Sequence, residues 1–167
     1  MAKKDNLGLL LLAVGAFLIV SRRAKAEPEP SVPIEIKFYN SEGRLVESNS
    51  PANLSEGESY TAVVTVTNQS TRGGELIEAR LSGYIFGEIM EPSYYFLLEG
   101  SFDETFGPGG TKSFSYPFSV PEGFGGSTGR AYATVYSPAE LLIGRVEEPL
   151  VITGVVTTWA AGIGIGF

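Results

Sequence analysis

The sequence predicts an all-β fold, an antiparallel β-sandwich, with a separate N-terminal membrane-anchor helix. From residue 34 onward, apolar and polar side chains alternate in short runs, which is the period of half-buried strands. The 21 glycines and 10 prolines separate these runs at the spacing of an all-β domain. We divide the chain into an anchor (1–26), a proline-rich linker (27–33), a β-sandwich (34–158) and an apolar, glycine-rich tail (159–167).

The anchor is predicted from residues 7–20, which carry no charge and no polar side chain. A helix of this length covers about 21 Å, against roughly 30 Å for a bilayer core. Lys4 and Arg22 flank the run, and their long side chains can reach the two interfaces. The predicted anchor residues are Leu7, Leu9, Leu10, Leu11, Leu12, Phe17, Leu18 and Ile19.

Two other interpretations of this segment stay open. The run has the length of a signal-peptide core, and Ala24 and Ala26 fit a small-residue cleavage pattern. Arg22, Arg23 and Lys25 oppose cleavage, because they stand where a signal peptide is normally neutral. A helix buried in a filament is the third interpretation. The basic residues nearly balance across the run, so the positive-inside rule does not fix its orientation.

Charge is divided unevenly along the chain. Residues 1–26 carry five Lys/Arg and one Asp, a charge of +4, whereas residues 27–167 carry seven Lys/Arg and eighteen Asp/Glu, a charge of −11. An acidic body argues against nucleic-acid binding, which requires clustered basic residues. The absence of histidine and cysteine removes the commonest general base and all thiolate chemistry. We predict no catalytic residue, no cofactor and no metal ligand.

The first half of the body predicts four strands after the linker. The linker has three prolines in seven residues, which favours an extended spacer. Residues 34–39 alternate, and residues 44–47 are expected to return as a short strand after a turn. Residues 58–68 give the clearest strand, rich in β-branched side chains. Residues 76–86 follow as a strand with Gly83 as an expected bulge.

The second half predicts five more strands. Residues 94–98 are aromatic, and a Gly-Pro-Gly-Gly turn at 107–110 precedes an alternating run at 111–120. Pro117 in this run indicates an edge strand or a bulge, because proline lacks the N–H that a central strand needs. The last strands are expected at residues 131–136, 141–146 and 150–158.

Four of these segments resemble the immunoglobulin-like modules of microbial surface proteins, of the cell-adhesion-related (CARDB) type. In those modules a strand ends in Asn, a Pro-Gly turn follows, and a later strand ends in Val-Pro. The matching residues are 63–68, 106–111, 114–121 and 131–136. The resemblance implies an immunoglobulin-like antiparallel β-sandwich that acts as a spacer or contact module, and it implies no catalytic residue.

The tail is predicted to make assembly contacts. Residues 149–167 contain no charge, and three glycines among the last nine residues make a poor helix. An exposed apolar end is expected to dock on its own sandwich, on a neighbouring subunit by strand addition, or on a membrane. The candidate contact residues are Trp159, Ile163, Ile165 and Phe167.

Weaker candidates for chemistry occur in the body. Asp103 and Glu104, near Glu99, are expected to be solvated acids and not a calcium site, since no spaced acidic loop surrounds them. Asn53 and Asn68 each begin an Asn-X-Ser glycosylation pattern. Lys37 and Lys112 are expected to face outward from alternating strands. A sugar-binding platform is a further alternative for Tyr94, Tyr95, Phe96, Phe102 and Phe106, although aromatic residues on strands are more often core.

The sequence therefore favours a non-catalytic structural or assembly protein over an enzyme. The expected partners are a membrane, through the N-terminal segment, and other protein subunits, including further copies of this chain. The body is expected outside the cytoplasm or at a virion membrane, within a cell-surface layer, a filament or a membrane-containing virion. The alternative is a tethered or secreted adhesion or carbohydrate-binding module.

Overall fold

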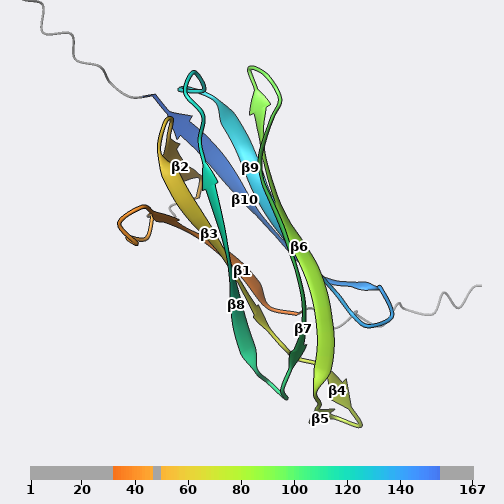
Figure 1. The fold of residues 1–167 in the computed structure, drawn as a ribbon. Helices are drawn as coiled ribbons and strands as arrows, with labels where there is room; N and C mark the ends of the chain where they lie inside the picture. Colours follow the sequence, from red (N-terminus) through yellow and green to blue (C-terminus); the bar gives the residue numbers. More distant parts are fainter. Residues whose placement is uncertain (1–31, 47–49, 155–167) are drawn as a thin grey trace, which may run out of the picture.

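The computed structural model describes residues 32–46 and 50–154, and every regular element in this part of the chain is a β-strand (Figure 1). The predicted anchor and the tail at 159–167 lie outside the described residues. Within those residues, no helix is long and apolar enough to cross a membrane. The strands are β1 (Ile34–Asn40), β2 (Ala52–Ser55), β3 (Ser59–Thr67), β4 (Thr71–Arg72), β5 (Glu75–Leu76), β6 (Ala79–Glu91), β7 (Tyr95–Phe106), β8 (Thr111–Ser119), β9 (Thr128–Tyr136) and β10 (Leu142–Thr153).

Two sheets form the body, as the all-β prediction requires. One has three strands in the order β1-β3-β8, and the other has five in the order β2-β10-β9-β6-β7. Figure 1 shows them as two layers, with the small β4-β5 ribbon at one end. Neighbouring strands are antiparallel except β2 and β10, which pair in parallel from Leu150 to Thr153. The predicted antiparallel pattern is therefore correct except at this edge.

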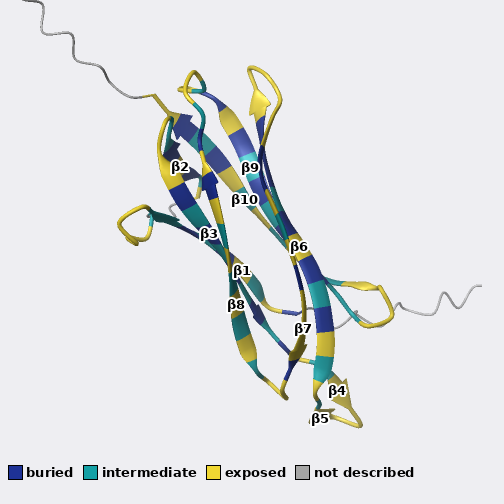
Figure 2. Ribbon diagram, viewed as in Figure 1, coloured by how far each residue is buried: buried dark blue, intermediate teal, exposed yellow. Residues whose placement is uncertain are grey.

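The core lies between the two sheets, and Figure 2 shows buried residues alternating with more exposed ones along strands such as β3 and β6. In β3, the alternation predicted for the strand at 58–68 is confirmed, because Tyr60, Ala62, Val64 and Val66 are all buried and the residues between them are not. The five-stranded sheet contributes a matching apolar set: Leu81, Ile85, Ile89, Ala131, Ala133, Val135, Leu150 and Ile152. Burial of this inner surface is the main force that holds the layers together.

Several strand boundaries differ from the prediction. The aromatic strand continues to Phe106, and the two strands expected at 141–146 and 150–158 form one strand, β10. Pro149 is accommodated because the pairing of β10 with β2 begins only at Leu150. The expected return strand at 44–47 is reduced to an isolated bridge between Tyr39 and Leu45. Strand β2 was missed because four residues pairing with a distant strand leave no periodic signal.

The predicted bulge at Gly83 is wrong. Pairing stays in register through Gly83 on both sides of β6, and the irregularities come later, at Gly87/Glu88 and at Ile89/Glu91. Gly83 instead permits a close approach. A Cβ atom there would collide with the Thr134 carbonyl oxygen and lie 2.5 Å from the Phe102 ring.

Of the two alternatives predicted for Pro117, an edge strand or a bulge, the structure shows the edge strand. Pro117 lies in β8, the outer strand of the three-stranded sheet, opposite Thr61 of β3. Because proline has no N–H, it leaves this open edge with one donor fewer for pairing with another chain.

Candidate interaction face

The outer face of the five-stranded sheet carries the most unusual surface in the described part of the chain. In β6, the residues between the core positions point outward: Arg80, Ser82, Tyr84, Phe86 and Glu88. Strand β9 pairs with them in register, so that Tyr84 lies opposite Thr134, Phe86 opposite Tyr132 and Glu88 opposite Arg130. Period-two alternation thus brings rings and charges from neighbouring strands side by side.

Aromatic rings form a row across this face. Tyr84 and Tyr136 stack with centroids 5.9 Å apart, and their hydroxyls share a 3.3 Å hydrogen bond. The Phe86 ring lies 5.4 Å from that of Tyr132 and 4.7 Å from that of Phe96. Tyr84 and Phe96 keep 39% and 43% of their surface exposed. The rings therefore pack on one another and still present apolar area to solvent.

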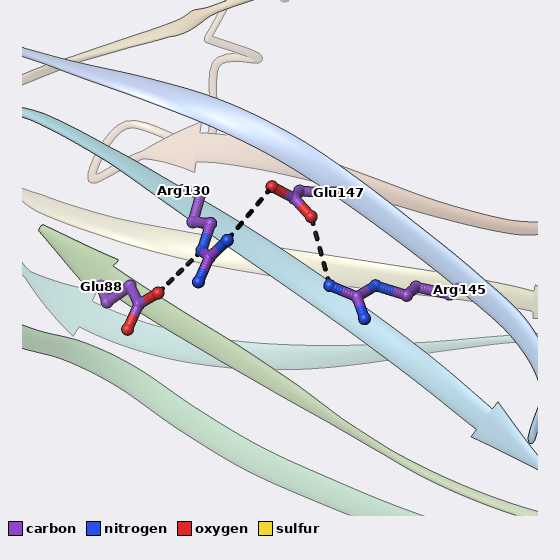
Figure 3. A network of polar contacts seen from close by, with 4 residues as sticks. All are labelled: Glu88, Arg130, Arg145 and Glu147. Carbon is purple, nitrogen blue, oxygen red and sulfur yellow. Dashed lines mark hydrogen bonds and ion pairs between the residues drawn. The ribbon is translucent and has the colours of Figure 1, made fainter. Parts of the chain in front are cut away.

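A line of four alternating charges crosses the same face, from β10 through β9 to β6 (Figure 3). The Arg145 guanidinium lies 3.3 Å from the Glu147 carboxylate, which lies 3.8 Å from the Arg130 guanidinium. Arg130 Nε donates to Glu88 Oε1 at 2.7 Å. Both guanidinium groups also lie over the Tyr132 ring, at 5.1 and 6.0 Å from its centroid.

Glu88 is the most enclosed member of this line, with only 8% of its surface exposed. Its hydrogen bond to Arg130 raises the pKa of that guanidinium above its ordinary value. Desolvation, and to a smaller extent a hydrogen bond to Glu88, raises the pKa of the Tyr94 hydroxyl. A buried carboxylate is costly without a partner, so Arg130 fixes Glu88 in place and Glu88 fixes Arg130.

A second ion pair lies further along the face. Arg80 donates from Nε and Nη2 to the two carboxylate oxygens of Asp103, at 2.8 and 2.7 Å. This hydrogen bonding lowers the pKa of Asp103. A shallow hollow beside the pair is also lined by Ser82, Ser137 and Pro138. The pair joins β6 to the edge strand β7 and leaves both side chains largely exposed.

The outer face of the three-stranded sheet is chemically different. Hydroxyl pairs join β3 to β8 there, each 2.9 Å apart: Ser59 with Ser119, Thr65 with Ser113, and Thr67 with Thr111. Such a small, polar surface is typical of a sheet that faces water. The two sides of the sandwich are therefore unequal, and the rings lie on the five-stranded side.

The structure divides the predicted sugar-binding set. Phe102 and Phe106 lie in the core and pack against Phe114, whereas Tyr94, Tyr95 and Phe96 are exposed by 64%, 40% and 43%. Sequence analysis does not identify the face residues Tyr84, Phe86, Tyr132 and Tyr136, because nearness in sequence groups other rings. The pattern that indicates them is the alternation of core and outward residues, since each ring lies between core positions of its strand.

The weaker candidates are also placed. Asp103 is ion-paired with Arg80, and Glu104 with Lys112 at 3.1 Å. In the described ranges, no cluster of three or more acidic residues is arranged so that it could hold a metal ion. Lys37 stands on the outer side of β1 as predicted. The outward prediction for Lys112 is wrong, because its ammonium lies on the core side, 5.3 Å from the centroid of the Phe106 ring.

The two glycosylation patterns differ in access. Asn68 is fully buried, and its amide donates to the carbonyls of Ile77 and Gly107 at 2.8 and 3.0 Å. It is a structural residue that closes the end of β3, and the acceptor interpretation is wrong in the folded domain. Asn53 is exposed.

Comparison with known proteins yields no family. No family model and no curated protein matches the chain. A PapD-like domain of human CEP192 is 14% identical over 81% of this chain and 95% of that one, with a TM-score of 0.44. A putative β-galactosidase from Bacteroides fragilis is 14% identical over 70% and 16%, with a TM-score of 0.44. Spo0M, a sporulation control protein of Bacillus subtilis, is 12% identical over 74% and 49%, with a TM-score of 0.43.

These comparisons concern architecture alone. The chain spans 16% of the β-galactosidase and about half of Spo0M. The sandwich itself is established by the chain's own two sheets, and the activities named for those proteins belong to those proteins.

Proposed function

We propose that this chain is a non-catalytic assembly protein, in which a membrane-tethered, immunoglobulin-like sandwich makes protein–protein contacts. The tether is the segment at 1–26, and the setting is a cell-surface layer, a filament or a membrane-containing virion. One observation carries the proposal: exposed aromatic rings and arginines gather on the outer face of the five-stranded sheet.

The composition of this face supports contact with protein. Tyrosine, phenylalanine and arginine are enriched in protein interfaces, because rigid rings and planar guanidinium groups bury much area at little entropic cost. Here they lie on strands, which hold them in a fixed register. The opposite face is instead lined by hydroxyl pairs between β3 and β8.

The order of the segments along the chain also supports the proposal, because the apolar run at 7–20 comes shortly before the sandwich. Val32 is already buried in the core, and its N–H donates to the Ile143 carbonyl at 2.8 Å. The folded body therefore begins within the predicted linker at 27–33, before its last proline, Pro33, whose carbonyl accepts a hydrogen bond from the Thr67 N–H. The resemblance to cell-adhesion-related modules favours the same contact role.

An adhesion or carbohydrate-binding module is the second candidate. The exposure of Tyr94, Tyr95 and Phe96 favours it, since aromatic faces also stack on sugars. Tyr95 and Phe96 are already engaged, however, with Phe124 at 5.0 Å and Phe86 at 4.7 Å. Mutual packing of these rings fits a protein contact better than a free sugar platform.

The mass of the full chain in mild detergent, measured by mass photometry after extraction from its source membrane, distinguishes the two candidates. We expect a defined assembly, either of this chain alone or with a second protein at fixed stoichiometry. A monomer that binds ligands on a glycan array would contradict the proposal and support the adhesion module. A monomer without glycan binding would also contradict it.

A further inference from the structure

We infer that the outer face of the five-stranded sheet binds a second copy of this chain across a two-fold axis. This inference rests on the proposed contact function, and it names the occupant and the residues that select it. A two-fold interface requires a self-complementary surface, because each residue on one copy meets its counterpart in reverse order on the other.

The charge line has this property. Followed from one ion pair to the next, its order is Arg145 and Glu147 of β10, Arg130 of β9 and Glu88 of β6, which alternates plus, minus, plus, minus (Figure 3). A two-fold axis through its middle reverses the order to minus, plus, minus, plus. Every position then lies opposite a charge of the other sign: Glu147 meets the second copy's Arg130, and Arg145 lies over the second copy's Glu88, of which only 8% is exposed.

The charge of the whole body favours the same occupant. The six ion-paired residues of the face are three arginines and three acids, with a sum of zero: Arg80, Arg130, Arg145, Glu88, Asp103 and Glu147. Of the seven Lys/Arg and eighteen Asp/Glu in residues 27–167, four and fifteen remain, so the rest of the body carries −11. Two acidic copies repel each other elsewhere, and this neutral face is where they approach at least cost. A basic partner protein would instead bind the rest of the body surface, which is acidic.

The rings add apolar area to the same contact. The stacked pair of Tyr84 and Tyr136 and the group of Phe86, Tyr132 and Phe96 flank the charge line on the same strands. Glu99, on the edge strand β7, lies at the rim, where water screens its charge. Positive and negative charges that sum to zero and stand in a fixed order give the contact its specificity, and the rings give it buried surface.

Exchanging two residues of the charge line tests the inference without changing the net charge. Arg145→Glu combined with Glu147→Arg gives the order minus, plus, plus, minus, which is identical when reversed, so that like charges face each other. The matched control is Arg44→Glu with Glu42→Arg. Arg44 and Glu42 form an exposed pair at 3.2 Å, also two residues apart, in the turn after β1.

Sedimentation equilibrium of the full chain in micelles measures the dimer dissociation constant of each variant. We expect the original chain and the control to dimerise equally, and the exchanged variant to dimerise at least about tenfold more weakly. Circular dichroism checks that each variant is folded. Should the exchanged variant fail to fold, Arg145→Glu alone against Arg44→Glu alone gives the same comparison, because each loses one pair to a neighbouring glutamate.

Equal dimerisation of the folded exchanged variant and the original chain would overturn this interface while leaving the contact function intact. A fixed complex with a different protein, without self-association, would have the same consequence. A monomeric original chain that binds glycans would overturn both the interface and the proposed function.

Discussion

Glu148 is a carboxylate on the inward side of β10, opposite the buried Ala131 and two residues before the buried Leu150. Its Oε1 atom is buried without a hydrogen-bond partner among the described residues. Burial raises the pKa of this carboxyl, and a hydrogen bond to Ser50 only partly opposes the shift. At neutral pH the folded protein therefore holds a charge in a place that disfavours it.

The pH dependence of stability follows from this shift. The pKa of Glu148 in the folded state lies above its ordinary value of 4.5, which applies to the unfolded state. Between these two values the folded state binds more protons than the unfolded state, so stability falls as pH rises through that window. Glu148→Gln should remove this fall and give a more stable protein at pH values above the window. Urea unfolding of the original chain and the variant, at pH values from acid to neutral, measures this difference in stability.

An exposed acid provides the control for Glu148. Glu75 lies in the small β4-β5 ribbon and is exposed, so Glu75→Gln should leave the pH dependence unchanged. A Glu148→Gln variant that loses stability at neutral pH, or keeps the original pH dependence, would contradict the assignment.

At the scale of elements, β6 fixes the positions of the face. It pairs with β7 on one side and β9 on the other, and it supplies inward core residues and outward ring and charge residues alternately. A loss of register in β6 would move Phe86 and Glu88 away from their partners on β9. Because Gly83 has no side chain, Thr134 of β9 and Phe102 of β7 can lie close to β6 at this position.

Gly83→Ala should therefore destabilise the sandwich. The added methyl group would meet the Thr134 backbone, which cannot rotate away, and the Phe102 ring of the core. We expect a loss of about 3 kcal/mol in the free energy of unfolding. Gly107→Ala is the control, because no atom lies within 4 Å of a Cβ at that site, and it should change stability by less than about 0.5 kcal/mol. Equal stability of the two variants would contradict the close approach.

The sequence predicted strands well wherever alternation was regular. The alternation along β3 is as expected, and Pro117 takes one of its two expected positions, because period two and the missing proline N–H are local properties. Prediction failed where partners were distant. Adjacent Leu97 and Leu98 are both buried beside an irregularity in β7, the pairing of β2 involves residues about a hundred positions away, and Pro149 stays within β10.

The interaction face could be predicted only in part. Its rings were visible as aromatic residues, but their grouping depends on strand order, which places β9 between β6 and β10. The charge line depends on the same order, since Arg145, Arg130 and Glu88 come from three strands. Sequence spacing gives no indication that these residues meet, and only the register of the sheet brings them together.

At the scale of the whole molecule, the two sides of the sandwich have different surfaces. Hydroxyl pairs cover the outer face of the three-stranded sheet, whereas rings and paired charges cover that of the five-stranded sheet. Charge is also divided along the chain, with +4 in residues 1–26 and −11 in residues 27–167. The proposed role uses both features, with the basic, apolar segment as the membrane attachment and the outer face of the five-stranded sheet as the contact surface.

Membrane attachment through residues 7–20 is the property on which this role depends, and flotation of the full chain with vesicles of phosphatidylcholine and phosphatidylglycerol tests it directly. The original chain should float with the vesicles, and so should Leu141→Lys, which alters an exposed leucine of the body. Leu11→Lys should reduce the bound fraction sharply, because a lysine at the centre of a membrane helix costs about 3 kcal/mol. Recovery of the intact original chain in the soluble fraction, or flotation unaffected by Leu11→Lys, would contradict the account.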